Sequence, residues 1–240
     1  MRTVLNKEQN DAYGKILAFL LGSDQGIILD GSGGTGKSFL IAYMYQNLLR
    51  DYQNLAGVLT GNTLSKLAVS STTNKACKSL SAILKGYVPT IHSLLNLTLT
   101  IDYKTGMENL TPTQNYSIQS DTIFIIDECS QINKELFRYI LKNRSCKFIF
   151  VGDKSQLSPV KEVISPVYQQ GYQVLSLKQY MRQQKPELIQ LADICKQAVD
   201  THKVKLPIDG QCVIHLDKSN TFTYLSNDFK QASFDHYVAC

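Results

Sequence analysis

Apolar and polar positions follow two rhythms along the chain, one typical of helices and one typical of buried strands. Apolar side chains recur at helical spacing from Ala12 to Leu20, and Asn6 with Gln9 three residues later predicts a capped helix start. The segments GIILDG, LAVSS, TIFIID and KFIFVGD are short apolar runs of strand length. Helical patterns separate these runs: SFLIAYMYQNLL, Lys75 to Leu84 and Asn133 to Leu141.

Strands that alternate with helices predict an α/β fold of the RecA-like P-loop type, with a doubly wound, mainly parallel sheet whose ligands bind at the carboxyl ends of the strands. A polar, Thr-rich stretch over residues 96–120 fits neither rhythm, and we interpret it as a small inserted subdomain or as a surface loop or hairpin. We expect a first domain over residues 1–165. A second, partial α/β domain over residues 166–240 is expected to contain the strand YQVLSL and a helix from Glu187 to Val199.

Composition sets a few further limits. A chain of 240 residues that is 43% apolar can fill the core of one large domain or two modest ones. The sequence shows neither an apolar run of membrane-spanning length nor a signal peptide, so we expect an intracellular protein without a membrane partner. The six cysteines lack zinc-site spacing and are expected to be reduced thiols. A net charge of +5 favours a polyanionic partner only weakly.

The strongest chemical signal is GSGGTGKS, which matches the Walker A pattern G-x-x-x-x-G-K-[ST] at every position, between a predicted strand and helix. Its glycines let successive N–H groups point inward around phosphate oxygens, and the helix that follows adds its positive end. We expect Lys37 to bridge the β- and γ-phosphates of ATP and the Ser38 hydroxyl to ligate Mg²⁺. The predicted nucleotide-binding residues of the loop are Gly31, Ser32, Gly33, Gly34, Thr35, Gly36, Lys37 and Ser38.

Two later strands end in polar residues that suit nucleotide hydrolysis. Asp127 and Glu128 directly follow the apolar run TIFII, where a Walker B acidic pair belongs. Asp127 is expected to hold Mg²⁺ through its water shell, and Glu128 to orient and deprotonate the attacking water. The next strand leads into VGDKSQLSPV, from which Gln156 is expected to contact the γ-phosphate or the attacking water.

These motifs, in this order, resemble the superfamily-one helicases, in the branch that contains RecD and the Dda helicase of T-even phage. The resemblance implies that Gln9 contacts adenine and that Arg182, in LKQYMRQ, reaches the γ-phosphate from a second RecA-like domain. It also implies that the insertion carries a strand-separating pin. STTNKA and TIHSLL resemble motifs that touch the single strand, which implies contacts from Ser71, Thr72, Thr73, Asn74, Lys75, Thr90, His92 and Ser93.

The sequence therefore predicts an ATP-dependent DNA helicase that acts on single-stranded DNA, with replication or recombination proteins as further partners. The resemblance to RecD and Dda implies movement from 5′ to 3′. An RNA helicase of the viral superfamily-one type stays open, because motifs that grip the backbone do not reveal the sugar. A nucleotide-gated single-strand-binding module also stays open, whereas the downstream motifs disfavour a small-molecule kinase. The family's later motifs are not found after Arg182. We therefore expect nucleotide binding, weak hydrolysis and no robust unwinding by the 240-residue chain.

Overall fold

The computed structural model describes residues 4–59, 64–102, 107–156, 159 and 162–181, which all belong to one compact unit, Met1–Arg182. Residues 182–240, which include Arg182, the predicted helix from Glu187 to Val199 and most of the expected second domain, lie outside the described residues. Within the described part of the chain, no helix has the length and apolar character needed to cross a membrane.

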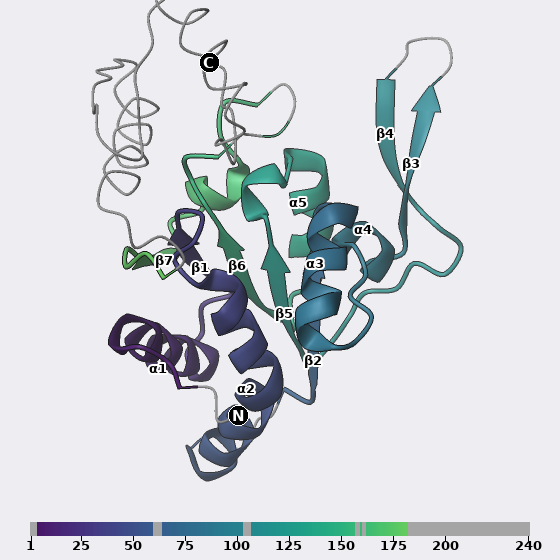
Figure 1. The fold of residues 1–240 in the computed structure, drawn as a ribbon. Coiled ribbons are helices and arrows are strands. Elements are labelled where there is room, and N and C mark those ends of the chain that lie inside the picture. The colour runs from purple at the N-terminus through teal and green to yellow at the C-terminus, as the bar shows by residue number, and fades with distance from the viewer. Residues whose placement is uncertain (1–3, 60–63, 103–106, 157–158, 160–161, 182–240) are drawn as a thin grey trace, which may run out of the picture. The chain divides into compact units, whose positions relative to one another are not determined.

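A parallel sheet forms the centre of this unit (Figure 1). Its strands, in spatial order, are β2 (Lys66–Ser71), β5 (Thr122–Asp127), β6 (Lys147–Gly152), β1 (Gly26–Gly31) and β7 (Gln173–Leu177). The helical segments are α1 (Lys7–Leu21), α2 (Lys37–Leu59), α3 (Asn74–Leu84), α4 (Ile91–Leu94), η1 (Cys129–Gln131), α5 (Lys134–Leu141) and η2 (Pro166–Gln169). All neighbouring strands of the sheet run parallel, so the predicted doubly wound fold is confirmed.

Two hydrophobic cores cover the two faces of the sheet. Along β1, Ile27 and Leu29 pack into the core shared with α1, α2 and α3, whereas Ile28 packs into the core shared with α5 and η2. The same alternation holds along β5 and β6, because successive side chains of a strand point to opposite faces. Strands buried on both faces explain why these segments read as continuous apolar runs in the sequence.

The last strand changes the expected domain boundary. β7 pairs in parallel with β1, with Leu175 beside Leu29, and therefore belongs to the first sheet. The sequence placed this strand in a second domain that begins at residue 166. The compact unit instead extends to Arg182. β6 pairs with one edge of β1 and β7 with the other. β7 therefore completes the burial of the strand that leads into the phosphate loop.

The Thr-rich insertion forms an antiparallel hairpin of β3 (Leu97–Asp102) and β4 (Met107–Pro112), which stands away from the sheet beside α4 (Figure 1). Helix α5 holds the hairpin at the backbone of Leu110. The Leu110 amide donates to the Glu135 carboxylate (3.1 Å), and the Tyr139 hydroxyl donates to the Leu110 carbonyl (3.4 Å). The interpretation of the insertion as a hairpin is thus confirmed.

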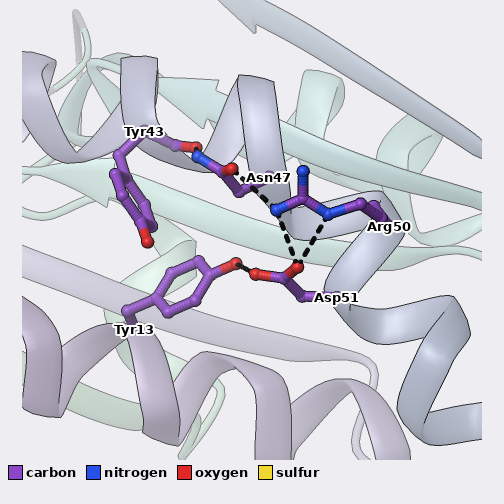
Figure 2. A network of polar contacts seen from close by, with 5 residues as sticks. All are labelled: Tyr13, Tyr43, Asn47, Arg50 and Asp51. Atoms are coloured by element: carbon purple, nitrogen blue, oxygen red, sulfur yellow. Dashed lines mark hydrogen bonds and ion pairs between the residues drawn. The ribbon is translucent and has the colours of Figure 1, made fainter. Parts of the chain in front are cut away.

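A polar network joins α1 to α2 (Figure 2). The Tyr13 hydroxyl donates to the Asp51 carboxylate (2.7 Å), and the Arg50 guanidinium donates to Asp51 and to the side chain of Asn47. The Tyr13 and Tyr43 rings meet edge to face, with centroids 5.1 Å apart. The network fixes α1 against the helix that begins at the phosphate loop.

Candidate functional site

The Walker A segment forms the turn between β1 and α2, as the sequence predicted. Gly34 and Gly36 take left-handed backbone angles, with φ of 85° and 87°, which side chains disfavour. The sequence assigned the curl to Gly33 as well, but Gly33 lacks a positive φ and a Cβ there would meet nothing within 4 Å, so the strict need for glycine falls on Gly34 and Gly36. Since α2 begins at Lys37, its first amides have no partner within the helix and are available to an anion.

Side chains of the loop hold its own backbone. The Lys37 ammonium donates to the carbonyls of Gly31 and Ser32, the second at 3.1 Å. The buried Thr35 hydroxyl also donates to the Ser32 carbonyl (2.8 Å). The loop therefore keeps its curled shape through internal hydrogen bonds, and the Lys37 side chain reaches back to the first two residues of the loop.

Gln9 packs directly against the phosphate loop. Its side chain is 1% exposed, and its amide nitrogen donates to the Gly36 carbonyl (3.3 Å). Its amide oxygen accepts from the Asn6 backbone in a capping box that starts α1. The start of α1 is thus fastened to the loop, while a contact between Gln9 and a base stays a prediction.

Asp127 and Glu128 lie at the carboxyl end of β5, close to Lys37. Burial, and then the neighbouring charge of Glu128, raise the pKa of Asp127 to about 6, and the Lys37 ammonium opposes that rise. The three charged groups therefore share one small site. Glu128 has a left-handed backbone (φ 56°), which costs about 1–2 kcal/mol for a residue with a side chain. Such strain clusters at functional positions.

The end of β6 is tied to β1 by a half-buried polar cluster around Asp30. The Asp30 carboxylate accepts from the Lys154 amide (2.8 Å) and from the Tyr168 hydroxyl (3.4 Å), and the Cys129 thiol donates to Tyr168 (3.6 Å). Burial raises the pKa of the Cys129 thiol to about 12, so this thiol stays protonated. Gln156 follows on an exposed bend.

The two segments expected to touch a strand meet at the carboxyl end of β2. Ser71 forms a parallel bridge with Thr90, which joins STTNKA to TIHSLL. The Ser71 hydroxyl donates to the Asp127 carbonyl and the Thr72 hydroxyl to the Glu128 carbonyl, both at 3.2 Å. Ser71 is 0% exposed and its hydroxyl faces the Asp127 carbonyl, so its contact with a strand stays a prediction that this conformation does not favour. It connects the acidic pair to the neighbouring segment instead.

The other predicted strand residues lie nearer the surface. Thr73 and Thr90 cap α3 and α4 through their hydroxyls, each at 3.2 Å. His92 is half-buried, and burial lowers the pKa of its imidazole, which is therefore neutral at pH 7. The side chains of this set that are exposed to solvent are Thr73, Asn74, Lys75 and Ser93.

A short segment after β7 is hydrogen-bonded to the phosphate loop and to the start of α1. The Glu8 carboxylate accepts from the backbone amides of Lys178 (2.9 Å) and Gln179 (3.0 Å). The Met181 amide donates to the Gly34 carbonyl (2.8 Å). The chain that continues to Arg182 is therefore bound to the phosphate loop itself.

Sequence reasoning missed Glu8, Asp30 and Tyr168. Asp30 carried a usable signal, because a carboxylate at the end of an otherwise apolar strand needs polar partners. Glu8 and Tyr168 carried none, since their partners lie far away in the sequence.

Comparison with known proteins gives matches over most of the chain. A family model described as AAA domain matches residues 4–215. An uncharacterized protein of Acanthamoeba polyphaga mimivirus is 28% identical over 177 residues, which cover 69% of this chain and 35% of that protein.

Solved structures of Pif1 helicases show the same fold. The match to the Candida albicans enzyme has a TM-score of 0.53 at 17% identity and covers 97% of this chain and 56% of that one. The match to the Bacteroides enzyme in complex with ADP-AlF3 and ssDNA has a TM-score of 0.52 at 15% identity, and covers 98% and 58%. The chain thus spans little more than half the length of these structures.

Proposed function

Because the chain belongs to the AAA domain family, we propose that it binds and hydrolyses ATP as the nucleotide-binding part of a superfamily-one DNA helicase. The observation that carries the proposal is the pair of hydrogen bonds from Ser71 and Thr72 to the carbonyls of Asp127 and Glu128. These bonds join the acidic pair to the segment that resembles a strand-binding motif. Hydrolysis and strand contact would then share one rigid piece of backbone.

Each charged residue of the loop region has a role in this proposal. The Lys37 ammonium exchanges its loop carbonyls for phosphate oxygens, which are stronger, charged acceptors. Glu128 accepts a proton from the attacking water. The Ser38 hydroxyl and the Asp127 carboxylate are hard oxygen donors that fit Mg²⁺, and the ion would neutralise phosphate charge when bound.

The strand-binding surface in this proposal is the amino-terminal end of α3 with the start of α4. Thr73, Asn74, Lys75 and Ser93 offer hydroxyl, amide and ammonium groups, which grip phosphates without reading bases. The solved Pif1 relative with bound ssDNA supports single-stranded DNA as the ligand. Movement from 5′ to 3′, Gln9 as an adenine contact and a γ-phosphate contact from Arg182 in a second domain follow from the family resemblance.

The test is the ATPase rate with and without single-stranded DNA. We expect a stimulated rate for the wild-type chain, loss of hydrolysis with retained ATP binding in Glu128→Gln, and loss of binding in Lys37→Ala. Asn74→Ala with Lys75→Gln should abolish the stimulation but leave the basal rate. The control, Lys7→Gln with Lys15→Gln, removes two charges from exposed positions of α1 and should change neither rate.

A wild-type ATPase rate that ignores single-stranded DNA would argue against the helicase. Equal stimulation by matched RNA would move the proposal to an RNA enzyme. Strand affinity that switches with nucleotide while Glu128→Gln leaves the ATP turnover unchanged would favour a nucleotide-gated binding module.

A further inference from the structure

Helix α5 has three distinct faces. Leu136, Phe137 and Ile140 are buried in the core, and Glu135 and Tyr139 hold the hairpin through Leu110. The remaining face is cationic and exposed, and consists of Lys134, Arg138 and Lys142. A helix turns by about 100° per residue, so positions four apart form one stripe, here about 12 Å long, opposite the buried face.

The charge of this stripe is not compensated by ion pairs among the described residues, where the salt bridges are Lys15–Asp11 and Arg50–Asp51. Helix stability does not explain Lys134 either, because the first turn of a helix favours acidic groups. Three like charges on one exposed face repel each other, and a polyanion relieves that repulsion.

The stripe borders the base of the hairpin. The Lys142 ammonium lies 4.2 Å from the centre of the Tyr139 ring, and the hydroxyl of the same tyrosine binds the Leu110 carbonyl in β4. The Lys142 ammonium thus covers one face of the Tyr139 ring, which also meets the Tyr116 ring edge to face. Single-strand sites pair basic groups with exposed aromatic rings, whereas a duplex can be held by its phosphates alone.

We propose that Lys134, Arg138 and Lys142 form a phosphate-binding stripe for the backbone of duplex DNA at the base of the hairpin. The inference rests on the proposed helicase function and on the family resemblance, which implies that the insertion carries the strand-separating pin, the point where a duplex meets its single-stranded tail. It assigns the duplex to α5 and the single strand to α3 and α4, so the two forms of DNA contact separate elements.

The experiment compares binding of the whole chain to a tailed duplex and to the tail alone over a range of salt concentrations. The variant is Lys134→Gln with Arg138→Gln, and Lys142 is kept because it packs on Tyr139. Each lost phosphate contact lowers the slope of log K against log salt by about 0.9, so the variant should flatten the slope for the tailed duplex by about 2. Binding to the tail alone should not change.

The control pair Lys7→Gln with Lys15→Gln removes the same charge from α1 and should leave the slope intact. A conservative pair, Lys134→Arg with Arg138→Lys, should keep the wild-type slope, which separates lost charge from damaged folding. The stripe is refuted by an unchanged slope, by an equal effect of the control, by equal weakening on the tail, or by a wild-type chain that does not bind the tailed duplex. These results differ from an ATPase rate that ignores single strands, which counts against the proposed function.

Discussion

A methyl group at Gly36 tests how the phosphate loop is built. Gly36 has a φ of 87°, and a Cβ added there would lie 2.5 Å from the Gln9 side-chain nitrogen and 3.4 Å from Met181 Cγ. For alanine, the left-handed angle costs about 1–2 kcal/mol. The Gln9 amide must also move away and lose its bond to the Gly36 carbonyl, a loss of about 0.5–1.5 kcal/mol.

These two losses act on nucleotide binding because phosphates need the curled loop. In Gly36→Ala the loop either keeps its shape under strain or relaxes out of it, and binding must then restore the shape. We expect the free loop to relax and escape both losses, so that ATP binding must restore them and its free energy weakens by up to about 1.5–3.5 kcal/mol. That change corresponds to an affinity roughly ten- to several-hundred-fold lower.

The assay is titration of a fluorescent ATP analogue with Mg²⁺, together with urea unfolding. Gly33→Ala is the matched control, because it adds the same methyl group to the same loop where nothing lies within 4 Å. It should change the affinity by less than about threefold. In a Gln9→Ala background the effect of Gly36→Ala should shrink, because the clash is gone and only the backbone strain is left. Equal losses of ATP affinity in Gly33→Ala and Gly36→Ala would refute the explanation by backbone angle and clash.

Three further outcomes follow from the contacts of the first helices and of α4. Glu8→Ala removes the acceptor of two amides after β7, which should exchange hydrogen markedly faster, while amides within β1 should not. Tyr13→Phe removes the bond to Asp51 and should lower the free energy of unfolding by about 1–3 kcal/mol in urea; an unchanged midpoint would exclude a stabilising role for the network. Burial lowers the pKa of His92 below 6.5 in the native state, so the unfolded chain takes up the proton first as the pH falls. Stability should therefore decrease as the pH drops through about 6.5, and His92→Asn should flatten that decrease in unfolding curves at pH 7.5 and 5.5.

The sequence predicted those features whose cause is local. Strands such as β5 and β6 are buried on both faces, and their apolar runs reveal this directly. The Asn6–Gln9 capping box spans four consecutive residues and depends only on their own backbone. The phosphate loop is likewise a local motif, although its pattern did not show that Gly36 requires a positive φ and Gly33 does not.

Features that depend on distant partners were not predictable in the same way. The assignment of β7 to the first sheet depends on β1, which lies far earlier in the chain. Ser71 sits in a motif that resembles a strand contact, yet its hydroxyl turns inward because the Asp127 carbonyl lies next to it across the sheet. Hydrophobic periodicity cannot distinguish these cases, because it reports which residues are buried and not which element buries them.

The placement of Ser71 and Thr72 bears on how hydrolysis could move a strand. Their hydroxyls bind backbone carbonyls of the acidic pair, and not the carboxylates, so the bonds persist when the carboxylates change partners. Thr73 then caps α3, and Ser71 bridges to Thr90, which caps α4. A shift of the backbone at the end of β5 therefore carries both helix starts with it. In the proposed function these bonds would link the acidic pair to the strand-binding surface, and coupling through them would need the end of β5 to have two arrangements.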